Sequence, residues 1–211
     1  MTRIVFQGDS ITDAGRDRSS ENNPGMGYPG FVRGKLGVDY PGKYEVLNRG
    51  VSGDRVVDVY ARIKRDIINL KPDILSILIG INDVWHEIMT GNGVDADKYY
   101  MVYDLLLTEV KAALPDIKLV ILEPFVLEAS ATCATEENPG RWEYFNAECR
   151  KRAEMAKKVA QKHSAVFIPL QDAFDEAAKL APADWWLRDG VHPTSVGHEL
   201  IARRWVKALG L

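Results

Sequence analysis

Short apolar runs alternate along the chain with longer stretches in which apolar residues are spaced three and four positions apart. The spaced stretches are typical of amphipathic helices and occur at residues 56–70, 99–114, 144–163 and 196–209. The short runs predict five strands, at residues 3–7, 44–48, 73–79, 117–122 and 165–168. Strands that alternate with helices form βαβ units, so this order predicts an α/β fold whose parallel sheet has helices on both faces.

The remainder of the pattern gives no reason to divide the chain. No repeat, linker or low-complexity stretch interrupts residues 1–211, which we therefore expect to form a single domain. The longest irregular stretch, residues 123–141, follows the fourth strand. Because ligands bind outside the carboxyl ends of parallel strands, we expect this loop to border the functional site.

Composition narrows the classes of partner. The 211 residues carry a formal net charge of −3, with acids and bases mixed, and they show no basic stripe for a nucleic acid. No apolar run is long enough to span a membrane, and the chain leads directly into a strand, so we expect a cytoplasmic protein unless a leader has been removed. Cys133 and Cys149 fit neither a disulfide framework nor a zinc site.

Polar clusters follow four of the predicted strands. They occupy residues 8–10, 48–54, 80–83 and 189–193, the last of them after the fifth strand and a short helix. The carboxyl ends of parallel strands lie at one edge of a sheet, so we expect the clusters to meet there. Each cluster alone is typical of a turn, because Gly, Asn, Asp and Ser are common turn residues. Together they supply the residue types that acyl transfer needs.

The first and last clusters contain a candidate nucleophile and a candidate base. A serine hydroxyl is a weak nucleophile at neutral pH and needs an imidazole within hydrogen-bond reach to accept its proton. Ser10 is the candidate nucleophile and His192 the candidate base. Such an imidazole needs a carboxylate on its far side, which Asp189, three residues before His192, can supply.

The tetrahedral intermediate of acyl transfer also needs fixed donors for its oxyanion. Three candidates come from the first three clusters: the Ser10 N–H, the Gly53 N–H and the side-chain amide of Asn82. A residue without Cβ lets its backbone approach a ligand closely, which suits Gly53 to this position. This chemistry requires no cofactor and no metal, and we expect neither.

The four clusters resemble the four sequence blocks of the SGNH hydrolases, also called GDSL esterases. Gly-Asp-Ser follows the first strand, a lone Gly the second and Gly-x-Asn-Asp the third, and Asp-x-x-His-Pro precedes the last helix. The usual Gly-Asp-Ser-Leu is Gly-Asp-Ser-Ile here, an apolar exchange that leaves the nucleophile in place. The resemblance implies a flavodoxin-like three-layer α/β/α sandwich, with the family's functional positions at Ser10, Gly53, Asn82 and His192 and with Asp189 completing a triad.

Longer strings carry a closer resemblance. Intracellular acetylxylan and acetyl-xylooligosaccharide esterases contain stretches similar to "GDSITDAGR", "NRGVSGDRVVD", "IGINDVWHE" and "GVHPTSVGHELIARRW". This resemblance implies a serine esterase that removes acetyl groups from small carbohydrates, with an acetylated oligosaccharide as its substrate. It also suggests a homo-oligomer, although no heptad or long apolar stripe in the chain indicates one.

Further residues near the clusters are candidates for a site role and for a structural one. Asp9 and Asp83 adjoin catalytic candidates, and we expect them to brace their loops through backbone N–H groups. Aromatic rings can bind sugar faces or anchor loops, so both interpretations stay open for them, and Tyr28 can either line the mouth of the site or seat the first helix. The candidate substrate contacts are Asp9, Tyr28, Trp85, His86, Trp185 and Trp186.

Other functions are consistent with parts of this pattern. A lysophospholipase or an acyl thioesterase would use the same triad with a longer acyl pocket. A non-catalytic binding protein on this fold is expected to have lost one of the catalytic residues, and all of them are present. A metal hydrolase with Asp9, Asp189 and His192 as ligands would leave Ser10 and the oxyanion donors without a function.

Overall fold

A parallel sheet of five strands forms the centre of the computed structural model, which describes residues 1–20 and 23–211. The strand order is β2-β1-β3-β4-β5, and every pair of neighbours is parallel. The strands are β1 (Thr2–Gly8), β2 (Tyr44–Asn48), β3 (Ile74–Leu78), β4 (Lys118–Leu122) and β5 (Val166–Ile168). The prediction of five parallel strands is confirmed, with ends that differ by one residue at most.

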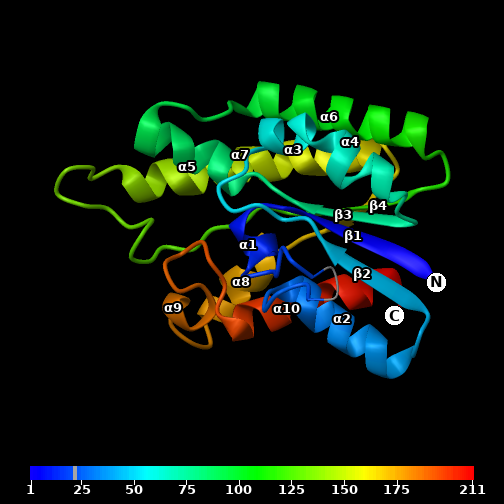
Figure 1. Ribbon diagram of the computed structural model, residues 1–211. Coiled ribbons are helices and arrows are strands. Elements are labelled where there is room, and N and C mark those ends of the chain that lie inside the picture. The colour runs from blue at the N-terminus through cyan, green and yellow to red at the C-terminus, as the bar shows by residue number, and fades with distance from the viewer. Residues whose placement is uncertain (21–22) are drawn as a thin grey trace.

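Helices cover both faces of the sheet, so the molecule has three layers (Figure 1). One layer contains α3 (Val56–Ala61), α4 (Ile63–Asp66), the 3₁₀ turn η1 (Ile68–Leu70), α5 (Ile81–Thr90), α6 (Ala96–Ala113) and α7 (Arg141–Lys162). The other contains α1 (Ser10–Asp13), α2 (Tyr28–Asp39), α8 (Gln171–Ala178), α9 (Ala183–Trp186) and α10 (Ser195–Leu209). This arrangement is the predicted α/β/α sandwich.

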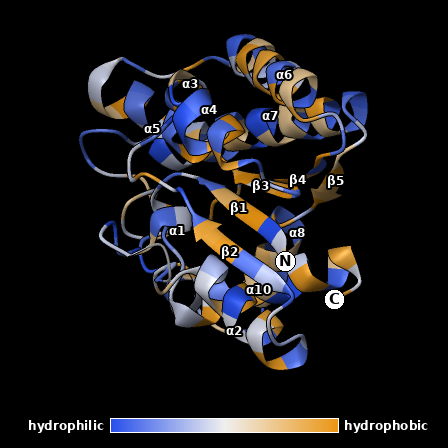
Figure 2. Ribbon diagram, turned by 45° about the vertical axis from the view of Figure 1, so that its right-hand side comes forward, coloured by the Kyte–Doolittle hydropathy of each residue, from blue (hydrophilic) through white to orange (hydrophobic). Residues whose placement is uncertain are grey.

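Alternation along the strands directs side chains into two separate cores. On β1, Ile4 and Phe6 belong to the core beneath α2 and α10, whereas Val5 belongs to the core beneath α3, α6 and α7. Phe6 packs against Tyr28 and Trp205, with ring centroids 5.4 and 5.3 Å apart. Figure 2 shows the apolar strands enclosed between the two helical layers. Strands that are buried on both faces need such continuous apolar sequences.

The strand order places a topological switch between β1 and β3. After β1 the chain turns to one side to form β2, and it then returns past β1 to form β3 on the other side. The loops after β1 and β3 therefore diverge from adjacent strand tips, which is where ligands bind in open α/β sheets. No helix in the described part of the chain is long and apolar enough to cross a membrane.

The helical prediction for residues 56–70 is wrong in one respect. The segment is divided into α3, α4 and η1, with breaks at Arg62 and Ile67. At the first break, the Arg62 guanidinium donates to the carbonyls of Arg49 and Gly8 and to the carboxylate of Asp54. These tertiary hydrogen bonds join the end of β1 to the loop after β2, and they stabilise a bend that the apolar spacing alone does not predict.

Candidate active site

Ser10 stands at the tip of β1, as the first residue of the short helix α1. Asp9 caps this helix by accepting a hydrogen bond from the N–H of Ile11 at 2.9 Å. The half-buried Ser10 hydroxyl lies 2.9 Å from Nε2 of His192, which comes from the opposite end of the chain. The structure therefore brings together the first and last of the predicted polar clusters.

His192 is held on its far side by Asp189. Its Nδ1 lies 2.7 Å from Oδ2 of Asp189, while Oδ1 accepts the N–H groups of Val191 and His192 at 3.0 and 2.8 Å. Burial by itself raises the pKa of Asp189, but the hydrogen bonds from the His192 ring and the two N–H groups outweigh it and hold that pKa well below its usual range. The carboxylate is therefore charged at neutral pH, opposite the imidazole.

The loop after β4 fixes the turn that carries Asp189. The N–H of Leu127 donates to the carbonyl of Gly190 at 2.9 Å, and the N–H of Ala131 donates to that of Asp189 at 3.0 Å. Buried Thr132 closes this part of the loop by donating to the Leu127 carbonyl at 2.6 Å. The prediction that residues 123–141 border the site is confirmed. Thr132 was not predicted, because nothing in an irregular stretch marks the one side chain that closes it.

Gly190 is the residue that this contact requires. Its φ of +96° is in the left-handed region that favours glycine, and a Cβ there would lie 2.4 Å from the Leu127 carbonyl and 2.5 Å from the Thr132 hydroxyl. A side chain at this position would therefore displace the loop from the turn between Asp189 and His192.

The candidate oxyanion donors come from the tips of β1, β2 and β3. Gly53 is exposed after β2 with a φ of +88°, and no atom lies within 4 Å of a Cβ built there. Asn82 is in the first turn of α5, and its Nδ2 donates to the carbonyl of Asp54 at 3.1 Å. A primary amide has two hydrogens, so the second remains for a substrate oxygen. The Asp54 contact joins Asn82 to the loop that contains Gly53.

Two further buried side chains support the same loop. Asp13 accepts the N–H and the hydroxyl of Ser52, both at 3.1 Å, directly before Gly53. The amide of Asn48 donates to the carbonyls of residues 12 and 24 at 2.6 and 2.7 Å. The sequence signal for each was its place in or near a predicted cluster, since Asn48 is the first residue of the cluster at residues 48–54 and Asp13 is three residues after Ser10.

Asp9 and Asp83 are both buried and bind backbone N–H groups, as predicted. Asp83 accepts the N–H of Val56 with its two oxygens at 3.1 and 3.2 Å. Oδ2 of Asp9 is buried and has no partner among the described residues. Burial raises the pKa of Asp83 well above its ordinary value of 3.8, and burial raises that of Asp9 to about 7. The carboxyl groups of Asp9 and Asp83, directly beside Ser10 and Asn82 in the chain, are thus in an environment that disfavours their charged forms.

The predicted aromatic contacts occupy different environments. The Trp85 ring lies 5.8 Å from the His192 ring, centroid to centroid, so it borders the candidate catalytic groups. Tyr28 is fully buried, and its hydroxyl lies 3.1 Å from that of Thr12. The expectation that Tyr28 lines the mouth is therefore wrong, and the alternative, that it seats α2, describes its position.

The remaining candidates are not placed against the catalytic groups by any direct contact. Trp185 is 58% exposed, whereas Trp186 is half-buried against the core beneath α10. His86 is half-buried on α5, within electrostatic reach of Asp58. Substrate contact by these three residues stays a prediction. A separate groove of about 720 Å³ runs along α2 and the edge strand β2, and it contains none of the predicted site residues.

Comparison with known proteins gives consistent matches over nearly the whole chain. The family model of the GDSL-like lipase/acylhydrolase family matches residues 6–200. An acetylxylan esterase of Geobacillus stearothermophilus is 35% identical over 219 residues, which cover 99% of this chain and 94% of that protein. Both shares are large enough to compare the two proteins as wholes.

Solved structures agree with the sequence comparison. The crystal structure of Axe2, an acetylxylan esterase from Geobacillus stearothermophilus, has a TM-score of 0.85 at 32% identity and covers 100% of this chain and 94% of that chain. An alpha/beta hydrolase enzyme from the metagenome of Lake Arreo has a TM-score of 0.86 at 30% identity, with coverages of 99% and 95%. Two further Axe2 structures are of catalytic mutants, in which a serine and an aspartate, respectively, are replaced by alanine.

Proposed function

Because the chain belongs to the GDSL-like lipase/acylhydrolase family, and is thus a carboxylic ester hydrolase, we propose that it removes acetyl groups from small carbohydrates. In this proposal Ser10 is the nucleophile, His192 the general base and Asp189 the partner of the base. The observation that carries it is the continuous hydrogen-bond chain from Ser10 Oγ through the His192 ring to Asp189, at 2.9 and 2.7 Å.

In the first half-reaction the Ser10 hydroxyl attacks the carbonyl carbon of the acetyl ester. Nε2 of His192 accepts the hydroxyl proton as the new C–O bond forms, and the charged Asp189 stabilises the resulting imidazolium through Nδ1. When the intermediate collapses, the bond to the sugar oxygen breaks and His192 transfers its proton to that oxygen. The sugar leaves as an alcohol, and the acetyl group remains on Ser10.

In the second half-reaction water replaces the sugar. His192 accepts a proton from the water as its oxygen attacks the acetyl carbonyl, and it returns that proton to Ser10 Oγ when the acyl–enzyme bond breaks. Acetate is the second product, and the free serine is restored. Water must therefore reach the same side of His192 from which the sugar has departed.

Both tetrahedral intermediates carry a negative oxygen. We assign its stabilisation to the N–H groups of Ser10 and Gly53 and to the Asn82 amide. The bond from Asn82 to the Asp54 carbonyl supports this assignment, because it orients the amide before substrate arrives. Such a donor contributes little to binding of the neutral ester. Its main contribution is to stabilise the transition state, in which the negative charge on the oxygen develops.

The choice of an acetylated sugar rests on the relatives and on Trp85. The acetylxylan esterase of Geobacillus stearothermophilus is 35% identical to this chain by sequence comparison and 32% identical by structure comparison. The half-buried Trp85 ring beside His192 offers an apolar face on which a sugar ring can lie. The competing proposal is a lysophospholipase or acyl thioesterase, which would use the same catalytic residues on a longer acyl chain.

The deciding experiment is acetate release from acetylated xylo-oligosaccharides, measured beside a series of synthetic esters of increasing acyl length. We expect the largest kcat/KM for acetyl esters and release of acetate from the oligosaccharide. A preference for acyl chains longer than butyrate would favour the lipid or thioester alternative instead.

A second measurement separates serine chemistry from metal chemistry. Both oxygens of Asp189 are occupied by hydrogen bonds from residues 191 and 192, which suits a partner of the base better than a metal ligand. We expect a serine-directed phosphonylating reagent to abolish activity and a chelator to leave it unchanged. The reverse result would contradict the assignment of Ser10.

A further inference from the structure

Two arginines near the candidate catalytic groups have no anionic partner in the part of the chain that the structure describes. Most arginines elsewhere in the molecule are paired, as Arg55 is with Asp58 and Arg62 with Asp54. In contrast, the guanidinium groups of Arg141 and Arg188 form no hydrogen bond or ion pair with any described residue. An unpaired guanidinium on an exposed helix is ordinary, so the location of these two decides whether they matter.

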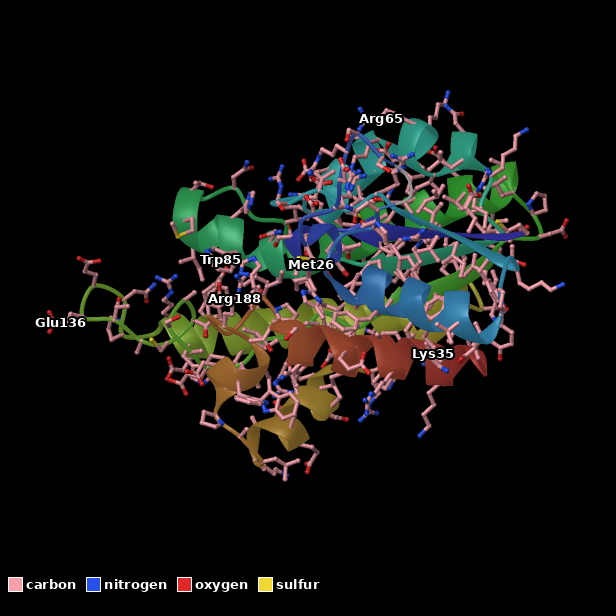
Figure 3. The ribbon with its side chains drawn as sticks, turned by 60° about the horizontal axis from the view of Figure 1, so that its bottom comes forward. Met26, Lys35, Arg65, Trp85, Glu136 and Arg188 are labelled. Atoms are coloured by element: carbon pink, nitrogen blue, oxygen red, sulfur yellow. The ribbon has the colours of Figure 1, made fainter. Side chains whose placement is uncertain are left out.

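Arg188 lies directly before Asp189 and beside His192. Its N–H donates to the carbonyl of His192 at 2.9 Å, and its side chain is exposed. Burial lowers the pKa of His198 to about 4, and the positive charge of Arg188 adds to this shift, so the guanidinium acts on the groups behind the catalytic turn. In the view of Figure 3, Arg188 and Trp85 are on the same side of the molecule, and Lys35 is on the other side.

A series of ring contacts connects Arg141 to His192. Its guanidinium carbon lies 5.7 Å from the centroid of the Phe145 ring, and Phe145 makes an edge contact with Trp85 at 5.7 Å. Trp85 in turn contacts the His192 ring. Nε of Arg141 is buried and has no hydrogen-bond partner within residues 1–20 and 23–211, which costs free energy unless a ligand supplies an acceptor nearby.

The planar fork of a guanidinium binds a carboxylate with two parallel hydrogen bonds. The hydroxyl and ether oxygens of a neutral acetylated sugar can accept single hydrogen bonds from a guanidinium, but they carry no charge to balance that of the two arginines. We propose that the natural substrate is an acetylated oligosaccharide that also bears a carboxylate on its sugar part, as a uronic acid does. Arg188 and Arg141 bind that carboxylate while Trp85 supports a sugar ring. This inference rests on the proposed function and specifies its substrate class.

The test compares two acetylated xylo-oligosaccharides that differ only in a glucuronate substituent. We expect wild-type kcat/KM to be about ten-fold higher for the acidic substrate at low salt, and the ratio to fall in 0.5 M NaCl, because salt screens the ion pairs. The ratio should fall about three- to ten-fold in Arg188→Gln and in Arg141→Gln. A ratio near one in the wild type, or the same ratio in both variants, would overturn the proposal.

Arg204→Gln is the matched control. Arg204 is also exposed and unpaired among the described residues, but it lies in the second half of α10, away from the turn at residues 189–192. Its replacement removes the same charge and should leave the ratio unchanged. A fall equal to that of Arg188→Gln would show that the preference depends on overall charge and would contradict a local site.

Two further experiments are needed. One tests whether the carboxylate is on the acyl part or on the sugar part of the substrate, and the other tests the inference independently of the proposed function. A wild-type preference for a 4-nitrophenyl hemisuccinate over the acetate would place the carboxylate on the acyl part and overturn the sugar assignment. If the wild type hydrolyses neither oligosaccharide, the proposed function fails, and calorimetric binding of the two substrates decides the inference alone. Tighter binding of the acidic one, lost in Arg188→Gln, supports it, and equal binding refutes it.

Discussion

The two halves of the candidate active site are held by different kinds of structure. On the nucleophile side, Ser10 and the Gly53 loop rest on buried polar side chains, among them Asp9, Asp13 and Asn48. On the base side, Asp189 and His192 are each about a quarter exposed and are held by their own turn. The side chain of Asp189 binds Val191 and His192, and the loop after β4 binds the backbone of the turn.

The two halves differ in how their side chains are held in position and in the free energy that this costs. Burying a polar frame fixes three strand tips at once, but it places carboxyl groups where their charge is disfavoured. The turn at residues 189–192 costs less free energy, because the carboxylate of Asp189 keeps a hydrogen-bond partner and partial contact with water. Its position depends, however, on the single loop after β4. We therefore expect changes on the nucleophile side to alter stability and its pH dependence, and changes on the base side to act through the turn and its loop.

The largest expected effect follows if Ser10, in one half of the site, and His192, in the other, act as one catalytic unit. Ser10→Ala and His192→Ala should each lower kcat by on the order of 10⁴–10⁶, because neither the nucleophile nor the base functions alone. The double variant should lose little more than either single variant. Steady-state kinetics with an acetyl ester measures all three, and near-additive losses would break the assignment of the two residues to one hydrogen-bond chain.

The next largest effect concerns the free-energy cost of burying the carboxyl group of Asp9 on the nucleophile side. Asp9 has a pKa of about 7 in the folded protein and about 3.8 when unfolded, so between these values the folded state binds more protons. Its contribution to stability therefore falls as pH rises from 4 to 7, by up to about 4 kcal/mol. Asp9→Asn cannot titrate, and its stability relative to wild type should increase from pH 5 to pH 8.

Urea unfolding of both proteins at several pH values measures this difference. The comparison between variant and wild type removes the contributions of the other titrating groups, since these are common to both. A difference that is constant with pH, or that shrinks toward pH 8, would show that Asp9 is charged at no cost and that the frame is better solvated than its burial indicates.

Asn82 tests how the nucleophile side serves the transition state. Asn82→Ala should lower kcat about 10²–10³-fold with little change in KM, because the lost donor acts mainly on the developing oxyanion. Asn82→Asp is a useful companion, since it keeps an acceptor but places a negative charge near the oxyanion, and it should be at least as impaired. An effect confined to KM would make Asn82 a substrate contact instead.

The smallest expected effect tests the turn on the base side. Gly190→Ala should lower the free energy of unfolding by about 2–3 kcal/mol, through its positive φ and the contact with the Leu127 carbonyl. Gly34→Ala on the exposed face of α2 is the control. A Cβ there meets nothing within 4 Å, so this change should stabilise the protein by about 0.5–1 kcal/mol. Thermal unfolding of both variants measures the contrast, and equal effects would contradict a glycine requirement at residue 190.

The sequence was sufficient for those features that depend on periodicity or on fixed chemistry. Five strands follow from apolar runs, and the approach of Ser10 to His192 follows from strand tips meeting at one edge. What it did not predict depends on contacts between distant segments. Arg62 lies within a helical pattern, yet it bends that segment and binds the carbonyl of Gly8, 54 residues away. Tyr28 fits a site aromatic by position alone, and only packing against Phe6 shows that it is buried.

The loop after β4 divides into an anchored part and a projecting part. Residues 127–132 bind the turn at residues 189–192. The backbone and side-chain hydrogen bonds of residues 135 and 138, in contrast, join these two residues to each other and to the start of α7. Figure 3 shows Glu136 at the far tip of this projection. The projecting part of this loop can therefore vary in sequence independently of the anchored part. Sequence exchanged between residues 134 and 140 can change what approaches the site, while the hydrogen bonds that align Asp189 with His192 stay as they are.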